Sequence, residues 1–259
     1  MICFLRASGI IASIVTNNFI SHTRLLKESN LAKILAIDTS AGACSVAIYG
    51  DGIRAEEFVL SPRDHTRKIL PMVDSILAAQ NLNLKDIDAI AFGRGPGSFT
   101  GLRIAAGVVQ GLAFGADLPV VPVSSLAAVA QGWIGEQAQP CEETICVAFD
   151  ARMSEVYFGS FQSEAGYSQL VGGELVSNPA KVELNGLTGP IVALGSGWNY
   201  AELLAETDCL VKDCEREVRA LDIAILGEQQ YLAGHSVSAE QAVPVYLRNE
   251  VSWKKLADQ

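Results

Sequence analysis

Residues 93–103 read Gly-Arg-Gly-Pro-Gly-Ser-Phe-Thr-Gly-Leu-Arg. They follow residues 87–92, which have the pattern of a buried strand, and they precede an apolar helical pattern at 99–114. A strand, a glycine-rich loop and a helix N-terminus can hold an oxyanion, because glycine lets the backbone approach a ligand and the helix end presents unpaired N–H groups. The loop is neither a Walker A motif nor a G-x-G-x-x-G motif. It therefore predicts an anion- or nucleotide-binding loop, with a simple chain turn as the alternative.

A second informative feature is the acidic turn Asp-Thr-Ser at residues 38–40. It ends a buried-strand pattern at 33–37, and further strand patterns follow at 44–49 and 54–60. These three segments, separated by turn residues, predict an antiparallel meander.

Both features recur in the second half of the chain. Residues 145–149 lead into a second acidic turn, Asp-Ala-Arg at 150–152, and a strand pattern follows at 155–161. Residues 191–197, Ile-Val-Ala-Leu-Gly-Ser-Gly, repeat the glycine loop in shorter form before a helical pattern at 199–206. Because the repeat is long and occurs twice, it predicts two pseudo-symmetric α/β domains rather than a solenoid.

The predicted organisation resembles the actin-like, sugar-kinase and Hsp70-like (ASKHA) folds, in which each domain is a mixed sheet with flanking helices. We expect an N-terminal domain at 33–135 and a C-terminal domain at 136–259, connected through residues 130–143. In such folds the acidic turns and glycine loops face a nucleotide-binding cleft between the domains. The predicted nucleotide- or anion-binding residues, functional or vestigial, are Asp38, Thr39, Ser40, Gly95, Gly97, Ser98, Thr100 and Arg103.

The composition limits what the chain binds. Of its 259 residues, 49% are hydrophobic and 19% are charged, which suits a packed globular protein, and the formal net charge is -10. Nucleic-acid binding relies on basic surface, so we expect a partner to supply most of any RNA contact. No run reaches the roughly 20 apolar residues that span a bilayer, and we expect no membrane partner. The six cysteines form no C-x-x-C motif, and we expect buried free thiols in a cytoplasmic protein.

Residues 1–32 stand apart from this pattern. The folded part is expected to begin at Lys33, and Leu31 is compatible with a non-AUG start codon. We therefore expect residues 1–32 to be an extension that is either disordered or lies upstream of the true start.

Two predicted helices supply candidate contacts with another subunit. Residues 64–80 show apolar residues at helical spacing, and in the second helix glycine recurs every fourth residue from position 107. Glycine lowers helix stability by about 1 kcal/mol relative to alanine. A face of small residues permits close approach, either to the domain's own sheet or to another subunit. The candidate interface residues are Ile69, Val73, Ile76, Gly107 and Gly111.

The residues of a metal or hydrolytic centre are missing from the sequence. It contains no H-x-x-x-H or H-E-x-x-H motif, and Ser98 lies in no G-x-S-x-G elbow. Asp38 and Asp150 remain as an acidic pair: in a kinase of this fold they bind metal-linked phosphate or act as the base. The alternative is that each aspartate hydrogen-bonds the backbone of its own hairpin. We predict no catalytic residue and no metal ligand.

Four stretches together resemble one family, TsaB, also called YeaZ. They are Ile-Leu-Ala-Ile-Asp-Thr-Ser at 34–40, Gly-Pro-Gly-Ser-Phe-Thr-Gly-Leu-Arg at 95–103, Asp-Ala-Arg-Met-Ser-Glu-Val-Tyr at 150–157 and Pro-Val-Tyr-Leu-Arg at 244–248. The second and third, in this order, are very specific, and the resemblance extends over about residues 33–255.

This resemblance implies a role in making threonylcarbamoyladenosine in tRNA, at the adenosine next to the anticodon. In that family TsaB pairs with TsaD, a paralogue that binds a metal through a histidine pair and transfers the threonylcarbamoyl group, and the ATPase TsaE joins the complex. The implied role is a non-catalytic scaffold that has no cofactor of its own, with ATP or ADP in the assembled complex and tRNA contacted through the partners. Pairing through a helix bundle implies the helices at 64–80 and 99–114.

Three alternatives stay open at this stage. A small-molecule kinase of the same fold predicts nucleotide turnover that depends on Asp38 or Asp150. A homodimer uses the same two helices. A peptidase, which the older name glycoprotease suggests, lacks both metal ligands and a nucleophile.

Overall fold

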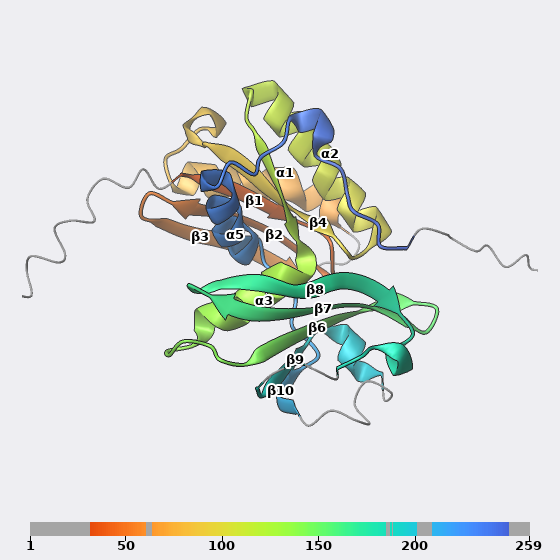
Figure 1. The fold of residues 1–259 in the computed structure, drawn as a ribbon. Helices are drawn as coiled ribbons and strands as arrows, with labels where there is room; N and C mark the ends of the chain where they lie inside the picture. Colours follow the sequence, from red (N-terminus) through yellow and green to blue (C-terminus); the bar gives the residue numbers. More distant parts are fainter. Residues whose placement is uncertain (1–31, 61–63, 185–186, 188, 201–208, 249–259) are drawn as a thin grey trace, which may run out of the picture. The chain divides into compact units, whose positions relative to one another are not determined.

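The computed structural model describes residues 32–60, 64–184, 187, 189–200 and 209–248. These residues contain two five-stranded mixed sheets, shown in Figure 1. The strand order is β3-β2-β1-β4-β5 in the first sheet and β8-β7-β6-β9-β10 in the second. Each strand of the second sheet thus occupies the place of the strand five numbers earlier, so the internal repeat and the predicted α/β fold class are confirmed.

The first sheet begins with an antiparallel meander, to which two parallel strands are added. β1 pairs antiparallel with β2 and parallel with β4, and β4 pairs parallel with β5. β1 is buried along its whole length, as expected for a central strand with both faces covered. The strands are β1 (Ile34–Asp38), β2 (Ala43–Gly50), β3 (Ile53–Leu60), β4 (Ala89–Gly95) and β5 (Val120–Ser124).

The second sheet repeats this pairing. β6 pairs antiparallel with β7 and parallel with β9, and β10 adds parallel to β9. The helix predicted at 199–206 lies mostly outside the described residues. The strands are β6 (Thr144–Arg152), β7 (Glu155–Glu164), β8 (Tyr167–Ser177), β9 (Ile191–Leu194) and β10 (Cys209–Asp213).

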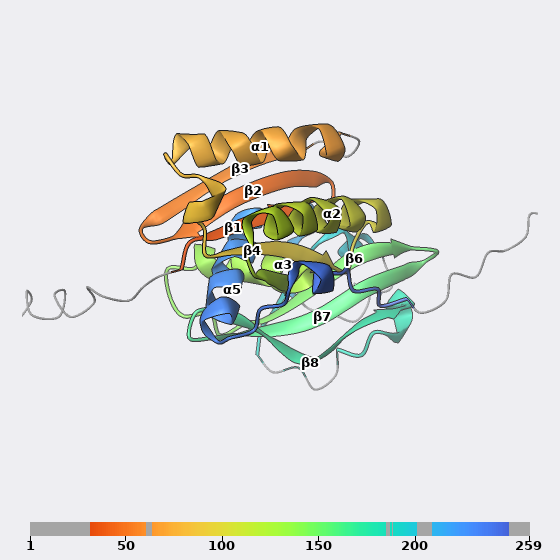
Figure 2. The ribbon, with the colours of Figure 1, turned by 90° about the horizontal axis from the view of Figure 1, so that it is seen from above.

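One face of the first sheet is covered by α1 (His65–Ala79) and α2 (Phe99–Ala116), which lie side by side in Figure 2. The apolar stripes of both helices pack on side chains of β1, β2 and β4 to form one core cluster. The two helices predicted from periodicity are therefore confirmed. Short 3-10 turns elsewhere are η1 (Leu84–Asp86), η2 (Pro179–Lys181), η3 (Ser196–Asn199) and η4 (Ala239–Gln241).

In length and composition α2 resembles a membrane-crossing helix. It has 18 residues with a mean hydropathy of 1.3, and it is the one such helix in the described part of the chain. At 18 residues it is shorter than the roughly 20 apolar residues that a span was expected to need. A core helix passes the same test, and α2 packs its buried face against β4 and β1.

The helix that follows each sheet packs on the opposite sheet. α3 (Ser125–Glu136) follows β5 and lies on β6, β7 and β8, whereas α5 (Ala220–Leu232) follows β10 and lies on β1, β2 and β4. The two helices touch each other between the sheets (Figure 1). We call the first sheet with α1, α2 and α5 the first lobe, and the second sheet with α3 the second lobe.

Residues 130–136 of the predicted connection at 130–143 form the end of α3, and the connection itself stays a prediction. The domain limits 33–135 and 136–259 stay a prediction, although α5 comes from the second half and packs on the first sheet.

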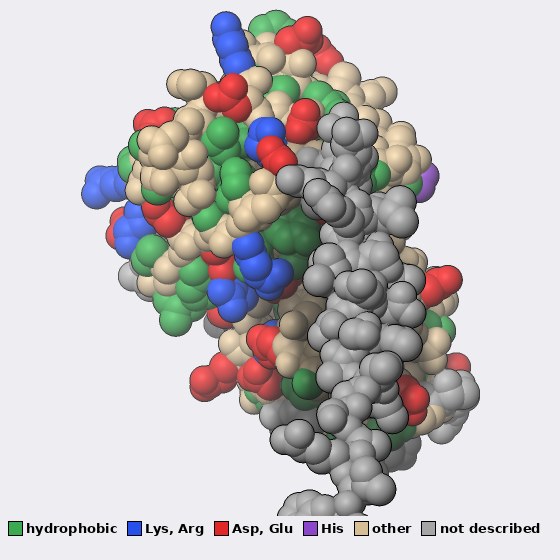
Figure 3. All heavy atoms as spheres, turned by 90° about the vertical axis from the view of Figure 1, so that its left-hand side faces the viewer, with side chains coloured by type: hydrophobic (Ala, Val, Ile, Leu, Met, Phe, Trp, Pro, Cys, Tyr) green, Lys and Arg blue, Asp and Glu red, His purple; other side chains and the backbone are tan. Residues whose placement is uncertain are grey.

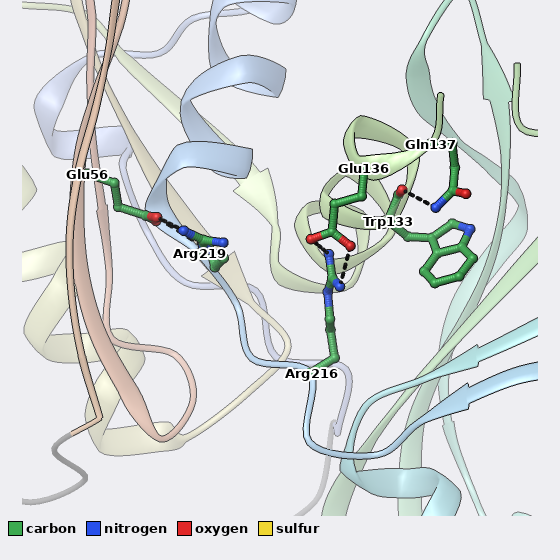
Figure 4. Close-up of polar contacts among 6 residues, drawn as sticks. All are labelled: Glu56, Trp133, Glu136, Gln137, Arg216 and Arg219. Carbon is green, nitrogen blue, oxygen red and sulfur yellow. Dashed lines mark hydrogen bonds and ion pairs between the residues drawn. The ribbon is translucent and has the colours of Figure 1, made fainter. Parts of the chain in front are cut away.

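Ion pairs hold the segment between β10 and α5 to both lobes (Figure 4). Arg216 donates two hydrogen bonds of 2.8 Å to Glu136 at the end of α3. Arg219 pairs with Glu56 on β3. One short segment is therefore attached to α3 on one side and to the first sheet on the other.

Candidate functional site

The acidic turn at 38–40 and the glycine loop are joined by hydrogen bonds. Ser98 N–H donates to the Ser40 carbonyl at 2.7 Å, and the Thr39 hydroxyl donates to the Gly101 carbonyl at 2.7 Å. Asp38, Thr39 and Ser40 are fully buried as a result. The structure thus brings together the two sequence motifs that were predicted to form one site.

The glycines of this loop make room for the protein's own backbone. A Cβ atom at Gly101 would lie 1.8 Å from the Thr39 carbonyl oxygen, and one at Gly97 would lie 2.3 Å from the Ser40 carbonyl oxygen. Real Cβ atoms do not come this close to another atom, so only glycine fits at either position. The close backbone approach that suggested a ligand is made by the acidic turn instead.

The C-terminal segment packs against the loop at Gly95. Val245 N–H donates to the Arg94 carbonyl at 2.8 Å. Gly95 has a φ of +104°, and a Cβ atom there would lie 3.0 Å from the Val245 carbonyl oxygen. The loop is therefore enclosed by the chain from two directions, the acidic turn and the C-terminal segment.

Asp38 is wholly buried behind the loop. Its Oδ2 accepts a hydrogen bond of 3.0 Å from Ser40 N–H, while its Oδ1 has no partner and faces Gly93. Burial raises the pKa of Asp38 to about 7, and the nearby Glu217 carboxylate acts in the same direction. The hairpin-binding interpretation of Asp38 is confirmed.

Asp150 forms the same local hydrogen bond in the second lobe. Its Oδ1 accepts 2.8 Å from Arg152 N–H and 3.0 Å from the Tyr200 hydroxyl, and its Oδ2 pairs with the Arg152 guanidinium. Both aspartates are thus bound within their own turns. A role of either in phosphate binding stays a prediction.

The accessible part of the site lies at the start of α2, where Ser98, Thr100 and Arg103 are exposed. The Ser98 hydroxyl caps the helix by accepting from Gly101 N–H at 3.3 Å. Arg103 does not reach back to the loop. Its Nε donates to the Tyr246 hydroxyl at 3.2 Å, and its guanidinium lies 3.8 Å from the centre of the Phe99 ring.

The candidate interface residues fall into two groups. Ile69, Val73 and Ile76 face the core beneath α1 and are at most 3% exposed, so their assignment to a partner interface is corrected: the apolar stripe of the helix covers its own sheet. Gly107 and Gly111 are exposed, and a Cβ atom at either would meet nothing within 4 Å. Packing onto the domain's own sheet therefore does not explain these glycines.

The described residues form neither a metal-binding site nor a reactive cysteine site. No group of three or more His, Cys, Asp or Glu side chains among them could hold a metal ion. Cys44, Cys141 and Cys146 are free and buried, and burial raises the pKa of each thiol to about 11 or 12. Cys3 lies outside the described residues.

The residues that sequence reasoning missed are Tyr246, Val245 and Arg94. The signal was present, because residues 244–248 carried part of the family resemblance, but nothing local indicated that they pack on the glycine loop. A contact between positions almost 150 residues apart leaves no trace in periodicity.

The fold and this pair of motifs define a two-lobed α/β protein. One family model matches most of the chain. The model described as "TsaD: tRNA N6-adenosine threonylcarbamoyltransferase" matches residues 33–243. A solved structure, YeaZ from Pseudomonas aeruginosa, superposes with a TM-score of 0.79 at 42% identity, over 83% of this chain and 100% of that one.

Curated relatives narrow the assignment. The tRNA threonylcarbamoyladenosine biosynthesis protein TsaB of Escherichia coli (strain K12) is 44% identical over 230 residues, 86% of this chain and 98% of that protein. The protein of the same name from Haemophilus influenzae is 43% identical over 86% of this chain and 96% of its own length. The chain belongs to the TsaB (YeaZ) family.

Proposed function

We propose that this chain is the non-catalytic partner of a TsaD-type paralogue in threonylcarbamoylation of the adenosine next to the tRNA anticodon. Membership of the TsaB family gives it a role in tRNA threonylcarbamoyladenosine biosynthesis. We further propose that the paralogue catalyses the transfer and that this chain supports it through a protein–protein contact.

The proposal that this chain is non-catalytic rests on the glycine loop, whose glycines are packed against the protein's own backbone. A nucleotide phosphate at this loop would have to occupy the positions of the Thr39 and Ser40 carbonyls and of Val245, all of which contact the loop glycines. Helix α2 already has its N-terminal turn capped by Ser98. Two of the N–H groups at this helix start, those of Ser98 and Gly101, are therefore used within the chain. Any ATP or ADP then belongs to the assembled complex rather than to this chain.

The outer face of α1 and α2 is the proposed partner surface. Its glycines at 107, 111 and 115 leave open space for a second helix to approach closely, and Leu70 of α1 and Phe114 of α2 are exposed at 47% and 76%. Large exposed apolar side chains next to small ones suit an interface between proteins. The same face serves the homodimer alternative, in which a second copy binds when the paralogue is scarce.

Charge supports an indirect contact with tRNA. The formal net charge is -10, and on the face drawn in Figure 3 acidic and basic side chains are intermixed rather than gathered into a basic patch. Phosphate binding needs clustered positive charge. We therefore assign most of the tRNA contact to the partners, the paralogue and the ATPase TsaE, in a cytoplasmic complex.

Substitution of the exposed glycines tests the partner surface. Gly107→Leu and Gly111→Leu each place a bulky side chain on the proposed face, and we expect loss of the complex with the paralogue on size-exclusion chromatography. The matched control is Gly135→Leu, an exposed helical glycine on α3 whose Cβ would also meet nothing within 4 Å. A folded Gly107→Leu protein that still forms the complex would refute this surface.

Reconstitution tests the function itself. Cognate paralogue, TsaE, tRNA and the enzyme that makes threonylcarbamoyl-AMP are combined with and without this chain, and modified adenosine is measured. The proposal expects product only when the chain is present and no ATP or peptide turnover by the chain alone. Turnover by the isolated chain that disappears in Asp38→Asn or Asp150→Asn would instead establish the kinase alternative.

A further inference from the structure

Residues 242–248, the last that the structure describes, form an extended segment that we call the strap. It begins on the first lobe, where the buried Ala242 accepts a hydrogen bond of 3.0 Å from the Gln110 side chain of α2. Just upstream, Val237 exchanges two backbone hydrogen bonds with Val120 at the start of β5. The start of the strap is therefore fixed to the first lobe.

The middle of the strap lies on the start of α2. Val245 is hydrogen-bonded to Arg94, as described above, and the Tyr246 hydroxyl accepts from Arg103. The Tyr246 ring lies 5.6 Å from the Phe99 ring, and both rings are about half exposed. Phe99, Arg103 and Tyr246 thus form one surface cluster, built from α2 and the strap.

The end of the strap reaches the second lobe. Arg248 donates to the Ala151 carbonyl at 3.2 Å, contacts the Met153 sulfur at 3.4 Å and pairs with the Glu155 carboxylate. All three belong to the hairpin between β6 and β7. Three successive residues at its tip, 152–154, have φ between 58° and 64°, a region that non-glycine residues rarely occupy. Arg248 thus contacts this tip and both strands that lead into it.

We propose that the strap couples the conformation of this hairpin to the partner-binding face of α2. We also propose that Phe99, Arg103 and Tyr246 belong to that face. The inference rests on the proposed function, because it deepens the contact with the paralogue. Arg103 lies one turn before Gly107 on the same exposed face of α2, so the cluster continues the glycine face. Aromatic and arginine side chains are those that most often dominate binding energy at interfaces.

A single residue, Leu247, lies between Tyr246 and Arg248, so the hairpin contact and the surface cluster cannot move independently. Other contacts on this side keep the lobes together: Glu174 of β8 pairs with Arg94 at 3.5 Å and hydrogen-bonds to Ser124. Loss of Arg248 should therefore loosen the strap and the hairpin without separating the lobes.

Arg248→Ala, compared with Arg152→Ala, tests the strap in the full chain. Arg152 is on the same hairpin, but its ion pair with Asp150 stays within it. We expect Arg248→Ala to raise amide hydrogen exchange at 150–157 and 245–247 about tenfold and to weaken paralogue binding by a similar factor. Arg152→Ala should change neither, and Arg248→Lys should restore part of both by keeping the charge.

Tyr246→Ala separates the two halves of the inference. It removes the aromatic group from the surface cluster and keeps Arg248, so it should weaken paralogue binding about tenfold or more with little change in hairpin exchange. Unchanged exchange in Arg248→Ala would overturn the role of the strap. Raised exchange with unchanged affinity would overturn the coupling. A wild-type chain that does not bind the paralogue would refute the proposed function and the partner face, while exchange in the chain alone still judges the strap.

Discussion

Asp38 and Asp150 occupy equivalent places in the two lobes, near the ends of β1 and β6. Each accepts a hydrogen bond from the backbone N–H two residues later. Their surroundings differ: Asp38 has no exposed surface, whereas the Asp150 side chain is 29% exposed and shares its carboxylate with Tyr200 and Arg152. The chain repeats its topology and its local turn chemistry, and a glycine loop contacts each turn, but only in the first turn is the aspartate fully buried.

A methyl group at Gly101 is the strongest way to break this buried turn. Gly101→Ala places a Cβ atom 1.8 Å from the Thr39 carbonyl oxygen, a backbone atom that cannot move aside alone. We expect a loss of more than about 5 kcal/mol in the free energy of unfolding, enough to abolish folding. Gly107→Ala, whose Cβ lies in open space on the same helix, should instead gain up to about 1 kcal/mol. Urea denaturation compares the two variants, and equal stability would contradict the close approach.

The pH dependence of stability tests how completely Asp38 is enclosed. Burial raises the pKa of Asp38 from its ordinary value of 3.8 to about 7 in the folded protein, so the folded state holds the proton more tightly. The stability contributed by this group is full below about pH 4, falls as pH rises toward 7 and is level above, a change of up to about 4 kcal/mol.

Asp38→Asn removes this group's share of the decline. Asp222, whose pKa burial also raises to about 7, contributes a second share that Asp222→Asn removes. Urea unfolding between pH 4 and 8 measures the slope. An Asp38→Asn variant that declines as steeply as the wild type would show that the carboxyl is not sealed.

Two ion pairs, one with a mostly buried arginine and one with an exposed arginine, allow a similar comparison. Arg216 is 15% exposed and bridges to Glu136 with two hydrogen bonds, whereas Arg152 is 86% exposed and pairs with Asp150 (Figure 4 shows the first pair). We expect Arg216→Ala to cost about 2 kcal/mol and Arg152→Ala about 0.5 kcal/mol or less. Thermal unfolding at low and high salt measures the stability lost in each variant. An equal loss of stability in both would argue against Arg216 as a link between the lobes.

The two serines of the glycine loops give the smallest expected effect. Ser98 caps α2, and Ser196 accepts a hydrogen bond of 3.1 Å from Asp150 N–H. Ser98→Ala should cost about 1 kcal/mol, because it leaves a helix N-terminus uncapped. Ser196→Ala should cost less than about 0.5 kcal/mol, because water can reach the Asp150 amide. Chemical denaturation of both variants tests the order, and a larger loss at Ser196 would reverse it.

Local patterns predicted the strands and helices that have strong periodicity or clear turns. The first meander, the two strands around the second acidic turn, α1 and α2 lie where the sequence placed them, because burial of a strand or a helix face imposes a period on its own residues. The helices α3 and α5 were missed. Their surroundings are apolar on several sides, so neither shows a polar stripe, and nothing in either segment indicates that it crosses to the other sheet.

The site shows the same limit. The sequence located the glycine loop, which depends on neighbouring residues. It did not show that Val245 fills one side of the loop, because that depends on where a distant segment returns. Ile69, Val73 and Ile76 were assigned outward because apolar spacing alone does not say whether a helix face meets its own sheet or a partner.

The exchange of α3 and α5 makes the two halves of the chain complementary parts. Residues 32–136 made alone would leave their sheet without α5 on one face, and residues 144–248 would lack α3 in the same way. Neither polypeptide closes its own core, yet each holds the helix that the other is missing. Two separate chains divided between Glu136 and Thr144 should therefore assemble by fragment complementation. During synthesis of the intact chain, the first sheet can complete its folding only after α5 has been made.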